Sequence, residues 1–367
     1  MTNKIRATGA AILVGLWAVL TGLAWFSPSK ETSVSERRPL AQFPKLNNET
    51  ILNGKFMAEF EDYTLDQFPG RDTFRQLKSL THYYALQQKD NNDIYIADGY
   101  AAKLDYPVNT EALNYALGRL NFVYETYLKE ASSKVYVAVI PDKGYYLAEK
   151  HGYPSMDYSL LFDAVKTKLP FATHIDITDC LKAEDYYFTD THWRQEALLP
   201  TAQKLRAAME LTALQESDFT KTKIDRPFYG VYYGQAALPM EPEELYILES
   251  QLLKECQVFN FESGKYFPVY DMDKVSGKDP YDVFLSGPQS LLRIENPNAA
   301  TDKALIVFRD SFGSSLVPLL VQDYKTVTLV DIRYLDSRLL DRFLEFNGQD
   351  VLFLYSTLVL NSGTTLK

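Results

Sequence analysis

Cysteine and histidine are scarce in this chain of 367 residues. The two cysteines, Cys180 and Cys256, are too few and too far apart for a disulfide framework or a zinc site, so they allow one optional bridge or two buried thiols. The four histidines show no His-x-x-x-His spacing, and no acidic cluster has the spacing of metal ligands. Metal-dependent hydrolysis is therefore poorly supported, and we expect no metal and no other cofactor.

A strongly basic segment is also missing. The formal net charge is −10, and no long run of lysine or arginine is available to neutralise a phosphate backbone. We therefore expect no nucleic-acid partner. Hydrophobic residues make up 46% of the chain, which predicts a well-packed globular body and argues against disorder.

An apolar run long enough to span a bilayer stands at residues 7–26. It carries no charge, and as a helix its length of about 30 Å would match a bilayer core. Lys4 and Arg6 precede it and Trp25 lies near its end, a pattern suited to an N-terminus in the cytoplasm. A cleaved signal peptide would have a shorter apolar region and a small-x-small cleavage site. We therefore expect residues 1–28 to be an uncleaved anchor of a cell-membrane protein whose globular domain is extracellular.

The rest of the chain is interpreted as a tether followed by an α/β body. Residues 29–92 begin as a polar, proline-containing linker and continue with two helical patterns separated by Pro69-Gly70. Asp98-Gly99 lies between two short apolar segments and predicts a hairpin at the start of the body. Across residues 93–367, strand and helix patterns alternate with short loops, which predicts an α/β fold with a doubly wound, mostly parallel sheet. Residues 215–270 fit this alternation poorly and are interpreted as an insertion that carries substrate-binding loops.

Ser311 stands where a buried strand is predicted to end. Residues 304–308 are all apolar, which indicates a strand covered on both faces, although the pattern alone also fits a buried helix. The carboxyl end of a parallel strand is where open α/β sheets place ligands, and a following helix offers backbone N–H groups there. Ser311 is therefore a candidate nucleophile. The alternative is that Asp310 and Ser311 simply cap the next helix.

His192 is the histidine best placed in the sequence to serve as a base for that serine. A serine hydroxyl needs a base within hydrogen-bond reach, and the base needs a third group to orient it. Among the four histidines only His192 has an aspartate two residues earlier, Asp190, in a polar and irregular segment. Asp190 would accept the Nδ1 proton and leave Nε2 facing the hydroxyl. The alternative is a surface histidine in a loop with an N-capping aspartate.

The segment Tyr186–Trp193, followed far downstream by Asp310-Ser311-Phe312, resembles the signature of the DHHW proteins of Gram-positive bacteria. These are similar to the SGNH-hydrolase-like domains of alginate O-acetyltransferases, in which Asp and His also precede Ser. Two residues depart from the pattern: Thr191 replaces the first histidine of the family's name, and Arg309 stands where many relatives of the wider class have glycine. Further blocks that fit in order are Ser35–Pro44, Asp66–Asp72, Pro141–Lys143 and Val330–Tyr334.

The resemblance implies an SGNH-hydrolase-like fold and a serine acyl-transfer enzyme. Its expected partners are a cell-surface polysaccharide, which is acetylated or deacetylated, and an acyl donor, often with a multi-span membrane O-acyltransferase supplying the acyl group. The resemblance favours transfer over hydrolysis. A second hypothesis is a catalytically inactive, anchored carbohydrate-binding or scaffold protein with a degenerate hydrolase fold, which would not need Ser311.

Four further residues are candidates for substrate binding, namely Trp193, Lys143, Gly287 and Arg309. Trp193 would stack on a sugar ring, although a tryptophan beside a helix start more commonly packs in the core. Lys143 follows a predicted strand and would place a cation near an oxyanion, whereas the simpler interpretation is a surface lysine. Gly287 would offer a backbone N–H to the oxyanion or form a plain turn.

Overall fold

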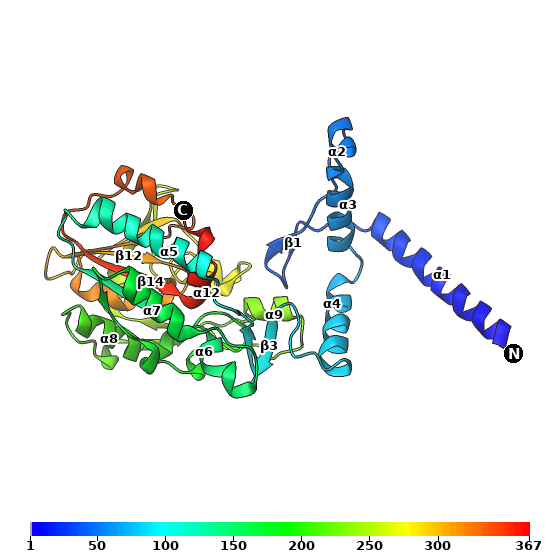
Figure 1. The fold of residues 1–367 in the computed structure, drawn as a ribbon, viewed down its shortest axis with the longest axis horizontal. Coiled ribbons are helices and arrows are strands. Elements are labelled where there is room, and N and C mark those ends of the chain that lie inside the picture. The colour runs from blue at the N-terminus through cyan, green and yellow to red at the C-terminus, as the bar shows by residue number, and fades with distance from the viewer. Residues whose placement is uncertain (1) are drawn as a thin grey trace. The chain divides into compact units, whose positions relative to one another are not determined.

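The computed structural model of this protein describes residues 2–367, which fall into two compact units. The first unit comprises the chain up to Asn91 together with Tyr233–Pro239. The second comprises Asn92–Tyr232 and Met240–Lys367. Figure 1 labels the elements of both.

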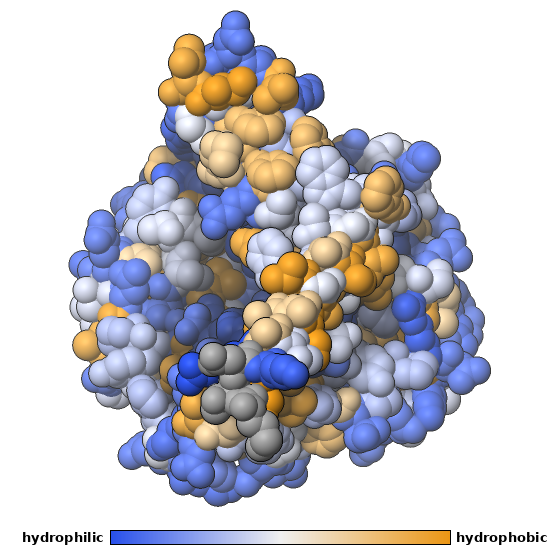
Figure 2. Space-filling model, turned by 90° about the vertical axis from the view of Figure 1, so that its right-hand side faces the viewer, coloured by the Kyte–Doolittle hydropathy of each residue, from blue (hydrophilic) through white to orange (hydrophobic). Residues whose placement is uncertain are grey.

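The first unit begins with α1 (Thr2–Phe26), whose stretch Lys4–Phe26 is long and apolar enough to cross a membrane. A signal sequence near the N-terminus can have the same length and apolar composition. Trp17 and Phe26 are exposed, and hydrophobic residues lie open on the side of the molecule shown in Figure 2. The sequence prediction of an apolar N-terminal helix is confirmed.

Short elements complete the first unit. α3 ends just before the predicted break at Pro69-Gly70, where Gly70 has a φ of 69° in the left-handed region that favours glycine, and α4 starts at the next residue. The two predicted helical patterns are therefore confirmed. The bounds are β1 (Thr32–Ser33), β2 (Arg38–Pro39), α2 (Asn48–Leu52), α3 (Lys55–Asp66), α4 (Arg71–Leu80) and the π-helical turn η1 (Thr81–Ala85).

The second unit begins with the hairpin of β3 (Ile94–Ala97) and β4 (Tyr100–Lys103), which pair in antiparallel fashion. Asp98 and Gly99 form its turn with φ values of 49° and 83°. The predicted hairpin is confirmed, because an Asp-Gly pair tolerates the two left-handed residues that a tight hairpin turn requires.

An eight-stranded sheet forms the centre of the second unit, in the order β10-β9-β11-β13-β12-β14-β5-β6. The strands from β13 to β6 run parallel, whereas β11, β9 and β10 add an antiparallel edge. The predicted fold class, a doubly wound and mostly parallel sheet, is confirmed. The bounds are β5 (Val135–Ile140), β6 (Thr173–His174), β9 (Gln257–Asn260), β10 (Lys265–Pro268), β11 (Leu291–Glu295), β12 (Ala304–Arg309), β13 (Thr326–Val330) and β14 (Asp350–Ser356).

Helices cover both faces of this sheet (Figure 1). Buried side chains of α5 (Thr110–Val123), α7 (Tyr158–Lys168) and α12 (Thr357–Asn361) pack in one core layer. Those of α8 (Leu199–Ala208), α11 (Gly313–Leu316) and the 3-10 helix η10 (Val317–Asp323) pack in the other.

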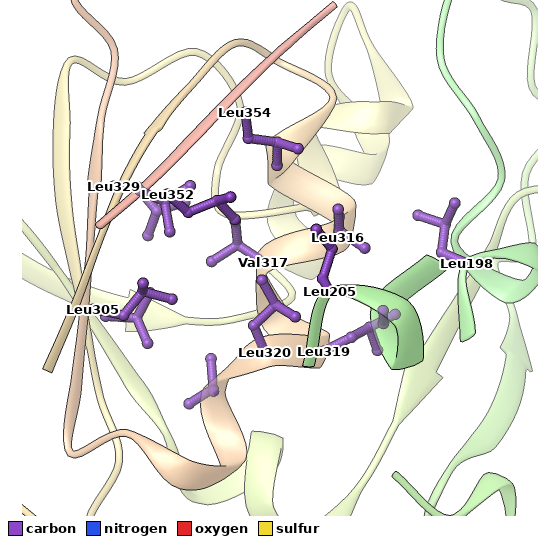
Figure 3. Close-up of a cluster of buried hydrophobic side chains, with 14 of the residues drawn as sticks. Leu198, Leu205, Leu305, Leu316, Val317, Leu319, Leu320, Leu329, Leu352 and Leu354 are labelled. Carbon is purple, nitrogen blue, oxygen red and sulfur yellow. The ribbon is translucent and has the colours of Figure 1, made fainter. Parts of the chain in front are cut away.

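Strand β12 contributes alternate side chains to the two layers. Leu305, labelled in Figure 3, and Val307 belong to the layer that also holds Leu205 and Leu316. Ile306 and Phe308 belong to the opposite layer. Each such apolar side chain contributes about 1.5–3 kcal/mol when fully buried. The predicted two-faced burial of residues 304–308 is therefore confirmed, and the strand that leads to Ser311 lies in the middle of the core.

Shorter elements connect the layers. The antiparallel pair β7 (Thr220–Lys223) and β8 (Tyr246–Glu249) lies within the segment that fitted the alternation poorly, whereas β9 and β10 extend the main sheet. The remaining helices are α6 (Lys143–Leu147), α9 (Val231–Ala236), α10 (Gln251–Glu255) and the π-helical turn η2 (Tyr124–Leu128). The remaining 3-10 helices are η3 (Glu149–His151), η4 (Thr178–Cys180), η5 (Ala183–Asp185), η6 (Gln195–Ala197), η7 (Glu216–Asp218), η8 (Met272–Ser276), η9 (Pro280–Val283), η11 (Ser337–Arg342) and η12 (Gly363–Thr365).

Candidate active site

Ser311 follows the carboxyl end of β12 in a tight turn that leads into α11. The buried carboxylate of Asp310 holds this turn, because Oδ1 accepts a hydrogen bond from the N–H of Phe312 at 3.0 Å and Oδ2 accepts one from the N–H of Ser356 at 2.7 Å. Gly313 completes the turn, since a Cβ at that position would lie 2.9 Å from Cβ of Arg309. The serine is thus displayed at the end of the strand and not packed in the core.

The imidazole of His192 lies between the side chains of Asp190 and Ser311. Nδ1 of His192 is 2.6 Å from Oδ1 of Asp190, and Nε2 is 2.8 Å from Oγ of Ser311. The backbone N–H of His192 donates to the same Oδ1 at 3.0 Å, and the N–H of Val231 donates to Oδ2 at 2.7 Å. Both carboxylate oxygens are therefore fixed. The structure brings the three predicted catalytic side chains into one continuous hydrogen-bonded chain, the arrangement in which an imidazole can take a serine proton.

Aromatic rings hold the imidazole in its plane. The ring of Tyr281 stacks on that of His192 with centroids 4.0 Å apart and an interplanar angle of 8°, and Phe312 lies 5.0 Å away on a tilt. The Tyr281 hydroxyl lies 2.8 Å from Oγ of Ser315. Burial raises the pKa of Tyr281 well above its usual range, so the stacked ring remains a neutral phenol.

One backbone donor beside the serine is available for a developing negative charge. Among residues 2–367, which the structure describes, no group accepts a hydrogen bond from the N–H of Ser311, whereas that of Phe312 is taken by Asp310. A free N–H at the nucleophile is what a tetrahedral oxyanion requires.

Lys143 does not lie on the surface, so the surface interpretation of this residue is wrong. It is 2% exposed at the start of α6, and its ammonium donates to the carbonyl oxygen of Tyr187 at 2.8 Å. Burial lowers the pKa of Lys143 to about 7, against the opposing effect of the Glu243 and Asp190 carboxylates. An ammonium engaged inside the protein has no open path to a substrate, which argues against the substrate-binding role as well.

Trp193 is fully buried and offers no ring face to a sugar. Its Nε1 donates to the carbonyl oxygen of Phe312 at 3.1 Å and to Oγ of Ser315 at 3.0 Å, and its ring packs edge-on against Phe312. The predicted stacking on substrate is therefore corrected to the alternative, core packing. The indole connects the segment of His192 to the turn that carries Ser311.

Arg309 and Gly287 both make hydrogen bonds within their own turns. Arg309 is 1% exposed and donates to the carbonyl oxygen of Asp310 at 3.3 Å, and burial lowers its pKa. Gly287 adopts a φ of 81°, and its N–H donates to the carbonyl oxygen of Phe284 at 3.2 Å. Because that donor is already used, Gly287 fits the plain turn and not an oxyanion hole.

Three residues around the site were missed by sequence reasoning. Gly230 lies so close to Asp190 that a Cβ on it would be 2.3 Å from Cα of the aspartate. Glu243 accepts hydrogen bonds from the N–H groups that precede Asp190, and Tyr281 stacks on the histidine. Gly230 stands in a stretch that is visibly interrupted by glycines, and this pattern could have indicated its role. Glu243 and Tyr281 carry no signal in the sequence.

A family model described as DHHW protein matches residues 175–330, the segment that contains Asp190, His192 and Ser311. The resemblance inferred from the sequence is thereby confirmed. No curated protein matches the chain.

Solved structures share the fold. A DHHW family protein from Eubacterium siraeum aligns with a TM-score of 0.61 and 22% identity, over 75% of this chain and 94% of that chain. PatB1 from Bacillus cereus, solved with a sulfonyl adduct, aligns with a TM-score of 0.58 and 19% identity, over 73% and 95% of the two chains. The O-acetyltransferase domain of Pseudomonas putida AlgJ aligns with a TM-score of 0.44 and 14% identity, over 73% of this chain and 92% of that chain.

Proposed function

We propose that this chain is a membrane-anchored serine acyl-transfer enzyme that acts outside the cell on the acetyl esters of a surface polysaccharide, as an O-acetyltransferase or an acetylesterase. The observation that carries the proposal is the hydrogen-bonded chain from Asp190 through His192 to Ser311. The similar fold of PatB1 adds support, because that protein holds a sulfonyl adduct and sulfonyl groups attach to activated nucleophiles.

In the proposed first half-reaction, Oγ of Ser311 attacks the acetyl carbonyl carbon of the donor while Nε2 of His192 takes the hydroxyl proton. The negative charge that forms on the carbonyl oxygen would be met by the N–H of Ser311. Collapse of the intermediate breaks the ester C–O bond, and His192 returns the proton to the leaving oxygen. Asp190 stays ionised throughout and stabilises the imidazolium.

In the second half-reaction, a hydroxyl group of the acceptor gives its proton to His192 and attacks the carbonyl carbon of the acetyl-serine. The bond to Oγ breaks, and the proton returns to Ser311. A sugar hydroxyl as acceptor gives transfer, and water gives hydrolysis.

The rest of the chain has a place in this proposal. Residues 1–28 would anchor the protein, residues 29–92 would hold the catalytic body away from the bilayer, and residues 93–367 would carry out the chemistry. A helix that can span a membrane supports the anchor. The acyl group would come from a membrane-embedded donor, such as a multi-span O-acyltransferase.

The test is hydrolysis of p-nitrophenyl acetate by the full-length protein in detergent. We expect Ser311→Ala to lower the rate at least about 1,000-fold, because the nucleophile is lost while the fold remains. Ser314→Ala is the matched control, since this serine lies three residues further on and its hydroxyl is not part of the hydrogen-bonded chain; it should keep the rate of the unmodified protein.

Two further results would decide the proposal. Phenylmethylsulfonyl fluoride should add one sulfonyl group to Ser311, detected by mass spectrometry, as fluoride leaves the sulfur and His192 takes the hydroxyl proton. Equal ester hydrolysis by the unmodified protein and Ser311→Ala would contradict the enzyme and favour the scaffold hypothesis.

A further inference from the structure

The three residues that precede Asp190 have every backbone N–H and C=O group in a hydrogen bond. Lys143 donates through Nζ to the carbonyl oxygen of Tyr187 at 2.8 Å and to that of Phe188 at 3.4 Å. Glu243 accepts from the N–H of Phe188 at 2.5 Å and from that of Thr189 at 2.6 Å. The ammonium therefore holds the carbonyl side of the segment, and the carboxylate holds its N–H side.

Neighbouring backbone groups complete this arrangement. The N–H of Tyr232 donates to the carbonyl oxygen of Thr189 at 2.9 Å, and the N–H of Gly230 donates to Oγ1 of Thr189 at 2.7 Å. The same hydroxyl donates to Glu243 at 2.6 Å. Because Val231 also donates to Asp190, the whole approach to the carboxylate is fixed on both sides.

Lys143 and Glu243 are both buried, at 2% and 9% exposure, and come from separate parts of the chain. Glu243 accepts three hydrogen bonds from N–H and O–H donors, which favour its ionised form, whereas burial raises the pKa of this carboxyl above its usual range. The charged groups that face Lys143 are Glu243, Asp190 and Asp142, and the ring of Tyr232 lies 5.1 Å from its Nζ. Burying two charged groups costs free energy of desolvation, so stability alone does not account for Lys143 and Glu243.

We infer that Lys143 and Glu243 are positioning residues that clamp the Tyr187–Thr189 segment from opposite sides and so hold Asp190 in place beneath His192. This inference rests on the proposed function for its effect on rate. The clamp fixes the carboxylate that orients the base, and a displacement of about 1 Å at a reacting group can cost roughly 100-fold in rate.

Lys143 and Glu243 carry opposite charges, so their removal should shift the pH profile in opposite directions. A general loosening of the fold would not produce opposite shifts. Below its pKa of about 7, Lys143 is a cation that interacts with Asp190, and Lys143→Met removes it, so the acidic limb of the pH profile of kcat/KM should move to higher pH. Glu243→Gln removes an anion and should move that limb to lower pH. Each shift is expected to be roughly half a pH unit or more.

The experiment measures kcat and KM of the full-length protein for p-nitrophenyl acetate from about pH 5 to pH 9. Both single variants should lower kcat at least about tenfold with KM changed less than about twofold, because orientation of the base matters in the transition state. The double variant Lys143→Met/Glu243→Gln removes both charges, so its acidic limb should return toward that of the unmodified protein while kcat stays low.

Two exposed residues supply matched controls. Lys150→Met changes a lysine whose side chain is 66% exposed, and Glu244→Gln changes the neighbour of Glu243, whose side chain is 56% exposed. Neither control should move the acidic limb. If circular dichroism shows that either single variant fails to fold, the double variant is used to test the clamp. It leaves no unpaired buried charge, because both charged groups are replaced by neutral ones.

A second readout separates failure of the clamp from failure of the proposed function. The proton on Nδ1 of His192, bonded to Asp190, should give a far-downfield NMR signal in protein labelled with ¹⁵N-histidine, whether or not the protein turns over esters. The signal should persist in Ser311→Ala and shift or vanish in Lys143→Met and Glu243→Gln. An unshifted signal and an unchanged acidic limb in both of those variants would overturn the clamp.

Discussion

The proposed nucleophile and the proposed base are held by two different kinds of structure. Ser311 follows a strand whose backbone pairs with β13 and β14 on either side, and one carboxylate, that of Asp310, secures the turn. His192 lies in a segment with one isolated strand bridge, and Lys143 and Glu243 reach in from distant parts of the chain to hold it. At the end of β12 the pairing of the sheet fixes the position of the side chain. In the loop, buried polar groups are needed to fix the position of the side chain equally well.

The comparison is tested most strongly by the same substitution in the two regions. Asp190→Asn should lower kcat by about 1,000- to 10,000-fold, because an amide facing Nδ1 stabilises the wrong imidazole tautomer. Asp310→Asn should act mainly on stability, since its amide would face the N–H of Phe312 or of Ser356 and leave buried donors unpaired, at a cost of about 1–3 kcal/mol.

The measurements are kcat with p-nitrophenyl acetate and thermal unfolding followed by circular dichroism. The result against this account would be a large loss of kcat in Asp310→Asn at unchanged stability, together with near-normal kcat in Asp190→Asn. That outcome would place the functional carboxylate at the strand end and not in the loop.

The same difference explains which residues the sequence could predict. Ser311 was accessible because a run of five apolar residues marks a buried strand, and such a strand displays the side chains just beyond its carboxyl end. Asp190 and His192 were accessible because they stand two positions apart. Glu243 lies more than fifty positions from the aspartate that it supports, so only the fold brings them together. Lys143 was placed correctly after a strand, but its burial depends on which loop covers that strand end.

A glycine substitution would disturb the loop without changing any charge. At Gly230 a Cβ would lie 2.3 Å from Cα, Cβ and N of Asp190, so Gly230→Ala must push the aspartate aside, and we expect kcat to fall roughly 100-fold. The control is Gly118→Ala in α5, where a Cβ would meet nothing within 4 Å and alanine favours the helix. Steady-state kinetics of both variants would show whether the close approach of Gly230 to Asp190 affects kcat. Equal kcat values would show that Gly230 is not needed to position Asp190.

Trp193 connects the two regions, so its substitution tests whether they depend on each other. Trp193→Phe keeps most of the buried ring but loses the donor to the Phe312 carbonyl and to Ser315. We expect a loss of about 1–3 kcal/mol in stability from the unpaired acceptors. We also expect kcat to fall roughly tenfold, because the histidine segment is no longer tied to the turn of the nucleophile. Thermal unfolding and kinetics measure the two effects, and a stability loss with normal kcat would show that the regions are positioned independently.

The smallest effect is expected where an aromatic ring supports the base without a hydrogen bond to it. Tyr281→Phe keeps the ring stacked on His192 and loses only the contact between its hydroxyl and Ser315, so kcat should stay within about threefold while stability falls by about 0.5–1.5 kcal/mol. Tyr281→Leu removes the flat surface as well, and the imidazole gains freedom to tilt away from Ser311. A lower kcat in the leucine variant than in the phenylalanine variant would show that the loop needs packing as well as polar contacts to orient the base; equal values would show that its hydrogen bonds alone are enough.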